Sequence, residues 1–336
     1  MVLNPFPISS PVQIQADWVE LKCLSDLYNC VPLADVRSAL EFQADEQDED
    51  IGREDGEVES VIDAILNEIR ERESNLTSSY PFQIELGGGV VSLTDSFEQL
   101  TIDQCVYIYC LVFSHISNSP ILTPSQKANN SDRDIMQICA TIAAAGYVRG
   151  HSISFGFPRP DNSNFYDKTQ SVIGLLGEGE LHAPDEINPI HSLSPKDAGI
   201  DVISWECMND NRPGRRILFS QVASGNNWKE KPVKPYIETF KNYWLKHPIL
   251  STINDAMFIP FDMTDDIDNR YTAEQFLNSQ LINLGTIFYR KRVPAYFKDG
   301  IKIGQQDGAI VERLNELDKI QNYVNDKVGL LKASAI

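Results

Sequence analysis

The chain has 336 residues, of which 42% are hydrophobic and 23% are charged, so it can form one large domain or two of ordinary size around a substantial core. Its formal net charge of −19 argues against a protein that simply coats nucleic acid. No stretch approaches the roughly 18 uninterrupted apolar residues of a membrane span, and the first residues lack the basic start and apolar run of a signal peptide. The 6 cysteines include no C-x-x-C pair, which fits reduced thiols in a cytoplasmic protein.

Residues 1–150 are predicted to be mainly helical. The segment 43–59 is rich in acidic residues and poor in apolar ones, so we expect a solvated loop there. Apolar residues recur at helical spacing in 58–72, "FQIELGGGVVSL" is typical of a strand pair, and "SDRDIMQICATIAAAGYV" indicates a buried helix with Ser131 as a candidate cap. Residues 1–100 carry 21 acidic and 5 basic residues, which makes a poor DNA surface and favours a regulatory or partner-docking region.

Residues 151–300 alternate between strand and helix patterns. "NFYDKTQSVIGLL" predicts a helix ending near Gly177, while "GIDVISWE" and "RRILFSQVAS" are apolar strands joined by a polar loop, as in a hairpin. "KPYIETFKNYWLKH" and "AEQFLNSQLINLG" predict helices on either side of a strand in "DAMFIPFDM". In 301–336 a further helix is expected, with an apolar stripe at Ile310, Leu314, Leu317, Ile320 and Val324. The fold class predicted is therefore α/β.

Polar residues stand on both strands of the predicted hairpin. Asp201 begins the first strand, Gln221 ends the second, and the turn "SGNN" leads to Lys229 and Lys231. Ends of adjacent strands hold side chains within a few ångströms of one another. Hard oxygen ligands at such a place suit Mg²⁺, and a nearby lysine can orient water or offset charge in phosphodiester cleavage.

A basic segment surrounds this hairpin. Residues 212–246 carry 8 basic and 2 acidic residues. The simpler interpretation is a solvated face, and the functional one is a set of phosphate contacts without sequence readout. The candidates for nucleic-acid binding are Arg215, Arg216, Lys229 and Lys234.

"KDAGIDVISW" followed by "ILFSQVASGNNWKEK" resembles the core of the PD-(D/E)XK, or restriction-endonuclease-like, nuclease superfamily. The similarity is to a branch with D-x-G-I-D and Q-x-A-x-G-x-N-W-x-x-K strands, and it covers residues 163–245. It implies an αβββαβ core within 151–300. Two positions depart from the pattern, because Ala198 stands where glycine is usual and Ala223 stands where many members have lysine.

The resemblance also implies roles for particular residues. Asp201 and Gln221 would hold Mg²⁺ (or Mn²⁺), with the main-chain carbonyl of Val222 as a further ligand. The catalytic lysine falls on Lys231, with Lys229 as the alternative. An acid from the preceding helix falls on Asp167, with two competitors at the helix end, Glu178 and Glu180.

The function implied is Mg²⁺-dependent DNA cleavage in a prokaryotic restriction or anti-phage defence system. Because the chain has no Walker motif, a helicase or translocase ATPase is a candidate partner, and an oligomer is compatible with the sequence. The alternative is a catalytically inactive nuclease-fold subunit that binds DNA or acts as a scaffold. In that case Asp201 would be a buried acid paired with an arginine or a backbone amide. Trp228 is expected to anchor the turn in the core rather than to stack on a base.

Overall fold

The computed structural model describes residues 1–47, 55–116, 119–124, 126–157, 159, 161–187, 198–210, 212–306 and 308–335. The side chains of 42–47 and 55 lie outside this description. The helices of these parts are α1 (Val12–Ser25), α2 (Leu33–Gln47), α3 (Asp55–Leu76), α4 (Ile102–Ile116), α5 (Asn130–Val148), α6 (Phe165–Leu176), α7 (Lys234–Thr239), α8 (Ala273–Leu284), α9 (Val293–Gly304) and α10 (Leu317–Ala335).

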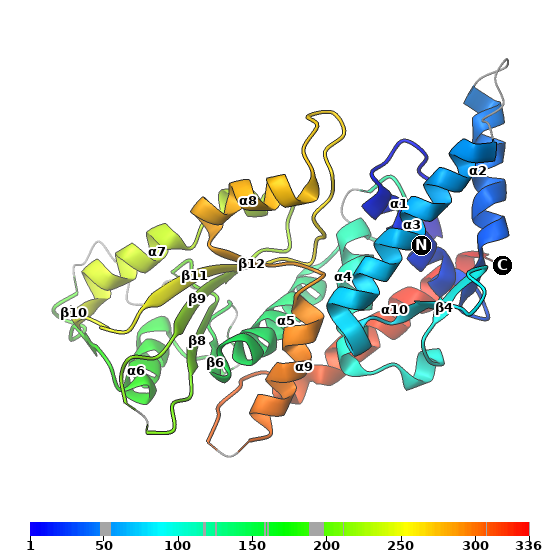
Figure 1. Cartoon of the computed structure of the whole chain (residues 1–336). Coiled ribbons are helices and arrows are strands. Elements are labelled where there is room, and N and C mark those ends of the chain that lie inside the picture. Colours follow the sequence, from blue (N-terminus) through cyan, green and yellow to red (C-terminus); the bar gives the residue numbers. More distant parts are fainter. Residues whose placement is uncertain are drawn as a thin grey trace.

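A five-stranded sheet organises one half of the molecule (Figure 1). Its strands, in spatial order, are β12 (Thr286–Phe288), β11 (Ile253–Phe258), β9 (Ile217–Val222), β8 (Val202–Glu206) and β6 (Gly150–Ser154). β6, β8 and β9 are antiparallel neighbours, whereas β9, β11 and β12 run parallel. The sheet is therefore mixed, and the α/β class expected from the sequence is confirmed.

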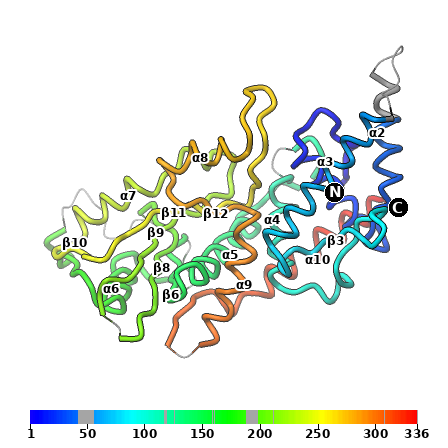
Figure 2. The backbone as a smooth tube through the Cα atoms, in the orientation of Figure 1, coloured from blue at the N-terminus to red at the C-terminus, as the bar shows by residue number. Residues whose placement is uncertain are grey.

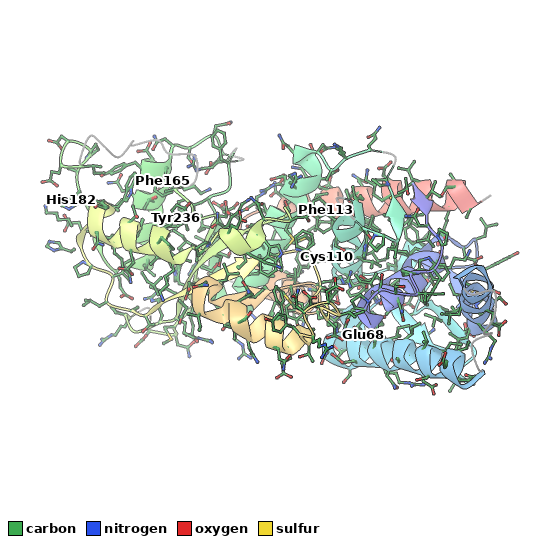
Figure 3. The ribbon with its side chains drawn as sticks, turned by 90° about the horizontal axis from the view of Figure 1, so that it is seen from above. Glu68, Cys110, Phe113, Phe165, His182 and Tyr236 are labelled. Atoms are coloured by element: carbon green, nitrogen blue, oxygen red, sulfur yellow. The ribbon has the colours of Figure 1, made fainter. Side chains whose placement is uncertain are left out.

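Each face of the sheet is covered by helices. Val202 and Leu218 belong to a large core shared with α5 and α9. Ile203 and Phe219 point to the opposite face, where residues of α6 and α7 cover them. Met257 and Ile287 on that face meet α8. Figure 3 shows Phe165 of α6 and Tyr236 of α7 in this half of the molecule, whereas Cys110 and Phe113 of α4 lie in the other.

The second half is helical, with a small sheet. α1, α3, α4 and α10 pack together, and β2 (Cys30–Pro32), β4 (Val90–Leu93) and β3 (Phe82–Ile84) form an antiparallel sheet beside them. Its core is continuous with the α5 and α9 face of the larger sheet. The two chain ends lie in this half (Figure 2), where Ser334 donates a hydrogen bond to the main-chain oxygen of Met1.

Further short pairings lie outside these two sheets. β1 (Val2–Leu3) pairs with β5 (Leu122–Thr123), and β7 (Glu180–Leu181) pairs with β10 (Leu245–His247). Val311 forms a parallel bridge with Ser152, so the chain after α9 lies along the outer edge of β6. None of the described helices is long and apolar enough to cross a membrane.

Several sequence-based boundaries differ from the structure. Of the loop expected at 43–59, residues 43–47 continue α2 and 55–59 begin α3, while 48–54 lie outside the described residues. The α5 helix is capped by Asn129 rather than Ser131. The Asn129 side chain accepts a hydrogen bond from the Asp132 amide at 3.0 Å, and the Asp132 carboxylate accepts one from the Asn129 amide at 3.0 Å. Ile310 belongs to the strand-like edge segment rather than to α10, which begins only at Leu317.

Candidate functional site

The residues of the candidate site lie at one end of the strands of the five-stranded sheet. β8 runs antiparallel to β6 and β9, so its amino end lies beside the carboxyl ends of those strands. β11 and β12 are parallel to β9 and also end at this edge. Loops at such an edge combine side chains from several strands on a rigid base.

Asp201 and Gln221 lie at the ends of two adjacent strands. The β8–β9 register ends with the pair Val202 and Ser220, so Asp201 enters β8 at the point where Gln221 and Val222 end β9. The ladder continues through the Asp201 amide, which donates to the Ser220 oxygen at 2.8 Å. Asp201 is 8% exposed, and its carboxylate oxygen Oδ2 accepts a hydrogen bond from the Val222 amide at 2.8 Å. One oxygen of the Asp201 carboxylate therefore already has a backbone donor at the end of β9.

The main chain of Asp201 is held from two sides. Its carbonyl accepts from the Phe155 amide at 2.7 Å and from the Gln137 Nε2 of α5 at 2.8 Å. Gln137 also donates to the Ser154 hydroxyl at 3.1 Å and is itself buried. Sequence reasoning missed Gln137; the available signal was an amide on the otherwise apolar buried face of the helix in 130–148.

Asp201 is preceded by a tight turn. Ala198 and Gly199 have φ values of 51° and 73°, a left-handed conformation in which glycine is unstrained and alanine is not. A Cβ on Gly199 would lie 2.3 Å from the Tyr236 ring. Tyr236 of α7 therefore packs directly on this turn, and it is a second residue that the sequence did not reveal.

Gln221 is half-buried, and its Oε1 has no hydrogen-bond partner within the described parts of the chain. A buried acceptor without a donor is unfavourable, so such an atom commonly meets a water or a ligand. Gln221 stands next to Met257 of β11 on the face covered by α7 and α8. An amide oxygen in this position is a suitable ligand for a hard cation.

The two candidate lysines have different surroundings. Lys229 is exposed, and its Nζ lies 4.4 Å from the ring centroid of Phe276 on α8, a cation–π geometry. Lys231 is half-buried between the buried residues Trp228 and Val233. Its main-chain amide donates to the Trp228 oxygen at 3.2 Å, but its side chain makes no hydrogen bond or ion pair with any described residue. The Lys231 amine is therefore available to a ligand. Trp228 packs in the core as expected, edge-on to Phe276.

The helix acids lie in three different environments. Asp167 is exposed in the first turn of α6, and its Oδ2 accepts from the Asn164 amide group at 2.5 Å. Glu178 is buried and accepts from the amide and hydroxyl of Ser251. Glu180 is exposed on β7, 3.7 Å from the Lys246 amine. In the described structure none of the three makes a polar contact with Asp201 or Gln221.

The paired arginines lie at the opposite edge of the sheet. Both precede β9, whereas Gln221 and Val222 end it. Arg215 is buried, with its Nε 3.7 Å from Glu178 Oε1. Arg216 donates to Glu206 at 3.3 Å, and this bond lowers the pKa of Glu206. These positions do not favour phosphate contacts at the candidate site, whereas Lys229 and the exposed Lys234 at the start of α7 lie on its side of the sheet.

The residues present can offer a metal few charged ligands. Among the described residues, no group of three or more His, Cys, Asp or Glu side chains could hold a metal ion. Asp201 and Gln221 provide one carboxylate and one amide oxygen. Mg²⁺ often binds through one or two carboxylates, several waters and substrate phosphates. The pair therefore fits a metal that is held chiefly together with its substrate.

Arg133 contacts the turn after Gln221. It lies in the first turns of α5, and its Nη1 is 3.4 Å from the Ser224 oxygen. Its guanidinium remains exposed, so it can also reach a ligand at this edge.

No protein-family model, no curated protein and no solved structure matches this chain.

Proposed function

We propose that this chain is a metal-dependent endonuclease of the restriction-endonuclease-like kind that hydrolyses DNA phosphodiester bonds. The observation that supports it most directly is the position of Asp201 and Gln221 at the ends of two adjacent strands, with Gln221 Oε1 buried and without a partner among the described residues. In chain order the helix α5 and the strands β6, β8 and β9 precede α7 and β11, with α6 and β7 between β6 and β8 and with β10 before β11. This order is compatible with the αβββαβ order that the resemblance implies if α5, which precedes residue 151, serves as its first helix. The change from antiparallel to parallel pairing at β9 is compatible with it.

Under this proposal each residue at these strand ends has a separate role. The Asp201 carboxylate and Gln221 Oε1 would hold Mg²⁺ or Mn²⁺, and the Val222 amide keeps the carboxylate oriented through Oδ2. A bound metal would supply a hydroxide at neutral pH and offset charge on the phosphate. Lys231, which makes no described ion pair, would orient the attacking water or neutralise the scissile phosphate. Arg133 and Lys229 would hold flanking phosphates.

The wider role proposed is the nuclease component of a prokaryotic restriction or anti-phage defence system. DNA would be the substrate, and a helicase or translocase ATPase would be the partner that supplies movement along it. A cytoplasmic location and an oligomeric assembly belong to the same proposal. These statements depend on the resemblance of residues 163–245 and on the absence of a Walker motif from the sequence.

A second candidate is a non-catalytic DNA-binding or scaffolding subunit with the same fold. Two observations favour it. Ala223, which stands where a lysine is common, is buried in the core. Asp201 Oδ2 caps the end of β9 by accepting from Val222, which is a structural use of a buried carboxylate.

Plasmid cleavage with Mg²⁺, with and without EDTA, tests the proposal, and titration calorimetry with Mg²⁺ and duplex DNA separates the two candidates. Asp201→Asn should lower the cleavage rate by about two orders of magnitude or more, because it removes the charge that holds the metal. It keeps an oxygen for the Val222 amide, so the fold should survive.

Asp167→Asn is the matched control, since Asp167 is an exposed carboxylate away from the pair, and its activity should equal that of the unmodified chain. Equal activity of the Asp201 and unmodified proteins would overturn the site assignment. DNA binding without metal binding or cleavage would favour the second candidate.

A further inference from the structure

Tyr236 lies near the start of α7, in the half of the molecule that holds the five-stranded sheet (Figure 3). A Cβ built on Gly199 would lie 2.3 Å from its Cγ, 2.4 Å from its Cδ1 and 2.5 Å from its Cδ2. Such similar distances to three neighbouring ring atoms place this point over the face of the ring and not beside its rim. One face of the Tyr236 ring therefore lies against the Gly199 backbone, in the turn that leads into Asp201.

The opposite face of this ring is open to solvent. Tyr236 is 42% exposed although one face of its ring is covered, so most of that exposure belongs to the other face and to the hydroxyl end. Its main chain is fixed, because its amide donates to the Val233 oxygen at 2.9 Å and both Val233 and Ile237 are buried. Tyr236 thus presents a fixed aromatic face beside the candidate site, at little cost in side-chain entropy.

Lysines lie along the chain segment that leads to this ring. Residues 229–236 carry Lys229, Lys231 and Lys234 against a single acidic residue. Lys229 and Lys234 are exposed, and Lys231 is half-buried with its amine available to a ligand. Proteins bind single-stranded nucleic acids through basic groups that follow the phosphates and aromatic rings that stack on the bases. The segment 229–236 supplies both kinds of group.

The position of Tyr236 favours an unpaired strand over a duplex. In a duplex each base is already stacked on its neighbours, so a side chain can stack only on a base that has left the stack. Asp201 is itself only 8% exposed, so a phosphodiester group must enter a recess to reach it. A single strand can do so more readily than a stiff duplex.

We propose that Tyr236 is a stacking platform for an unpaired base of the DNA strand that enters the Asp201 site, with Lys231 and Lys234 binding the phosphates beside that base. The substrate class is therefore single-stranded or locally opened DNA rather than intact duplex, and the helicase partner proposed above would supply such a strand. The inference rests on the proposed nuclease function for the fate of the strand, whereas its binding can be measured without cleavage.

Equilibrium binding of the full chain to a fluorescein-labelled single-stranded oligonucleotide, and to the duplex of the same sequence, tests the platform. EDTA is present throughout, so the result does not depend on cleavage. The duplex carries the denser phosphate charge, so a surface that binds through charge alone would prefer it. We expect the single strand to bind more tightly than the duplex, by about fivefold or more.

Tyr236→Leu fills the space against Gly199 without an aromatic face, so it should lower the affinity for the single strand by about 5- to 100-fold and leave the affinity for the duplex unchanged. Tyr236→Phe keeps the ring and should bind like the unmodified chain. Tyr28→Leu is the matched control, because Tyr28 is 85% exposed and lies between α1 and β2, in the other half of the molecule. It should bind both DNAs like the unmodified chain.

A 2-aminopurine base placed at successive positions of the single strand reports stacking directly, because its fluorescence falls when it stacks on a ring. The unmodified chain and Tyr236→Phe should quench it at one position, and Tyr236→Leu should not. A purely structural role of Tyr236 would not produce this difference. The preference for the single strand and the quenching are both measured on the unmodified chain, so the proposal remains testable should Tyr236→Leu not fold.

Equal affinity of the unmodified chain for strand and duplex would overturn the platform, as would an unchanged affinity for the strand in Tyr236→Leu. A preference for the strand that depends on Tyr236, in a chain that does not cleave DNA when Mg²⁺ is added, would support the platform and overturn the proposed nuclease activity. Cleavage without such a preference would overturn the platform and support the nuclease activity.

Discussion

At the scale of single residues, the turn before β8 determines where the Asp201 carboxylate points. Ala198 and Gly199 are both left-handed, and Tyr236 covers the second of them. Ala198 therefore adopts a conformation that favours glycine, at a cost of about 1 kcal/mol in strain,.

Gly199→Ala is expected to destabilise the chain by about 2–3 kcal/mol, combining left-handed strain with displacement of Tyr236. Gly177→Ala is the matched control, because Gly177 has a φ of 69° but no atom within 4 Å of the added Cβ. Strain alone should cost about 1 kcal/mol there. Urea unfolding measures both. Equal losses in the two variants would show that Tyr236 yields freely and does not support the turn.

The residues of the candidate site were predictable only in part. Asp201 and Gln221 could be recognised because a hairpin of known strand direction brings its two ends together. Gln137 and Tyr236 come from helices 64 residues before and 35 residues after Asp201 (positions 137, 201 and 236). Their contact with the site depends on how α5 and α7 pack on the sheet, which local periodicity does not encode. Arg215 and Arg216 were assigned to the site because of their charge alone. They precede β9, so they lie at the opposite end of that strand from Gln221.

At the scale of elements, the crossing of α5 and α9 supports the whole face beneath β8 and β9. A Cβ on Gly146 would lie 2.0 Å from the Tyr296 oxygen, and one on Gly300 would lie 1.9 Å from the Ile142 oxygen. Both obstacles are backbone atoms, so the two helices are in contact through their glycines. This closeness lets α9 pack onto α5 while α5 packs on the sheet.

Gly146→Ala and Gly300→Ala should each cost about 3 kcal/mol or more, because the helices would have to move apart. Gly329→Ala on α10 is the control, since nothing lies within 4 Å of its added Cβ. It should be neutral or stabilise the helix by up to about 1 kcal/mol. Thermal and urea unfolding distinguish these outcomes. Tolerance of alanine at Gly146 and at Gly300 would contradict the close crossing.

The elements themselves were more predictable than their edges. The helices α3, α5, α6 and α8 and the strands β8, β9 and β11 follow from periodicity, because each has a clear apolar pattern. β6 was not foreseen, since "GHSIS" alternates small polar residues whose burial comes from Gln137, Ser204 and the Val311 edge segment. The acidic loop was overestimated, because α2 continues to Gln47 and α3 begins at Asp55, within the charged sequence.

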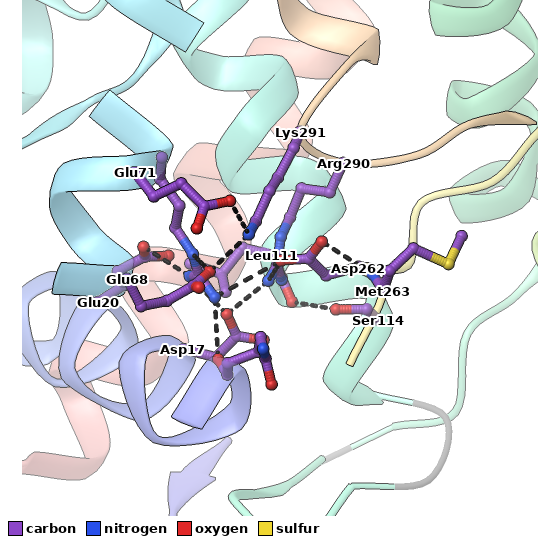
Figure 4. A network of polar contacts seen from close by, with 12 residues as sticks. Asp17, Glu20, Glu68, Glu71, Leu111, Ser114, Asp262, Met263, Arg290 and Lys291 are labelled. Carbon is purple, nitrogen blue, oxygen red and sulfur yellow. Dashed lines mark hydrogen bonds and ion pairs between the residues drawn. The ribbon is translucent and has the colours of Figure 1, made fainter. Parts of the chain in front are cut away.

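At the scale of the whole molecule, the acidic N-terminal region is an integral part of the fold. Its core is continuous with the face of the sheet that α5 and α9 cover. Buried ion pairs also connect it to the loops after β11 and β12 (Figure 4), because Arg290, just after β12, donates to Asp17 of α1 and to Asp262 in the loop after β11. A partner that docks on the N-terminal helices would therefore act on a body that is packed directly against the carboxyl edge of the sheet. Figure 1 shows α4 beside the chain that leaves β12.

The last prediction concerns Asp17 of α1, whose buried carboxylate is in contact with Arg72, Arg290 and His115. Burial alone would raise the pKa of Asp17, but Arg290 and Arg72 outweigh it and hold the pKa well below its usual range. A carboxyl group with a depressed folded-state pKa stabilises the fold above its unfolded value of about 3.9, and this contribution is lost as the pH falls toward the folded value. Acid should therefore weaken these contacts from about pH 4 downward.

Asp17→Asn should cost about 3–5 kcal/mol at pH 7, because it leaves two buried arginines without their shared carboxylate. The difference in unfolding free energy between this variant and the unmodified chain should shrink steadily below about pH 4, because the Asp17 carboxyl then gains a proton in the unfolded chain while it stays ionised in the folded protein,. Asp103→Asn is the control, because Asp103 is a buried acid in the same half but bonds to Ser79 instead. If the Asp17 difference stayed constant from pH 7 down to pH 2, these contacts would owe their stability to packing rather than to the charge on Asp17.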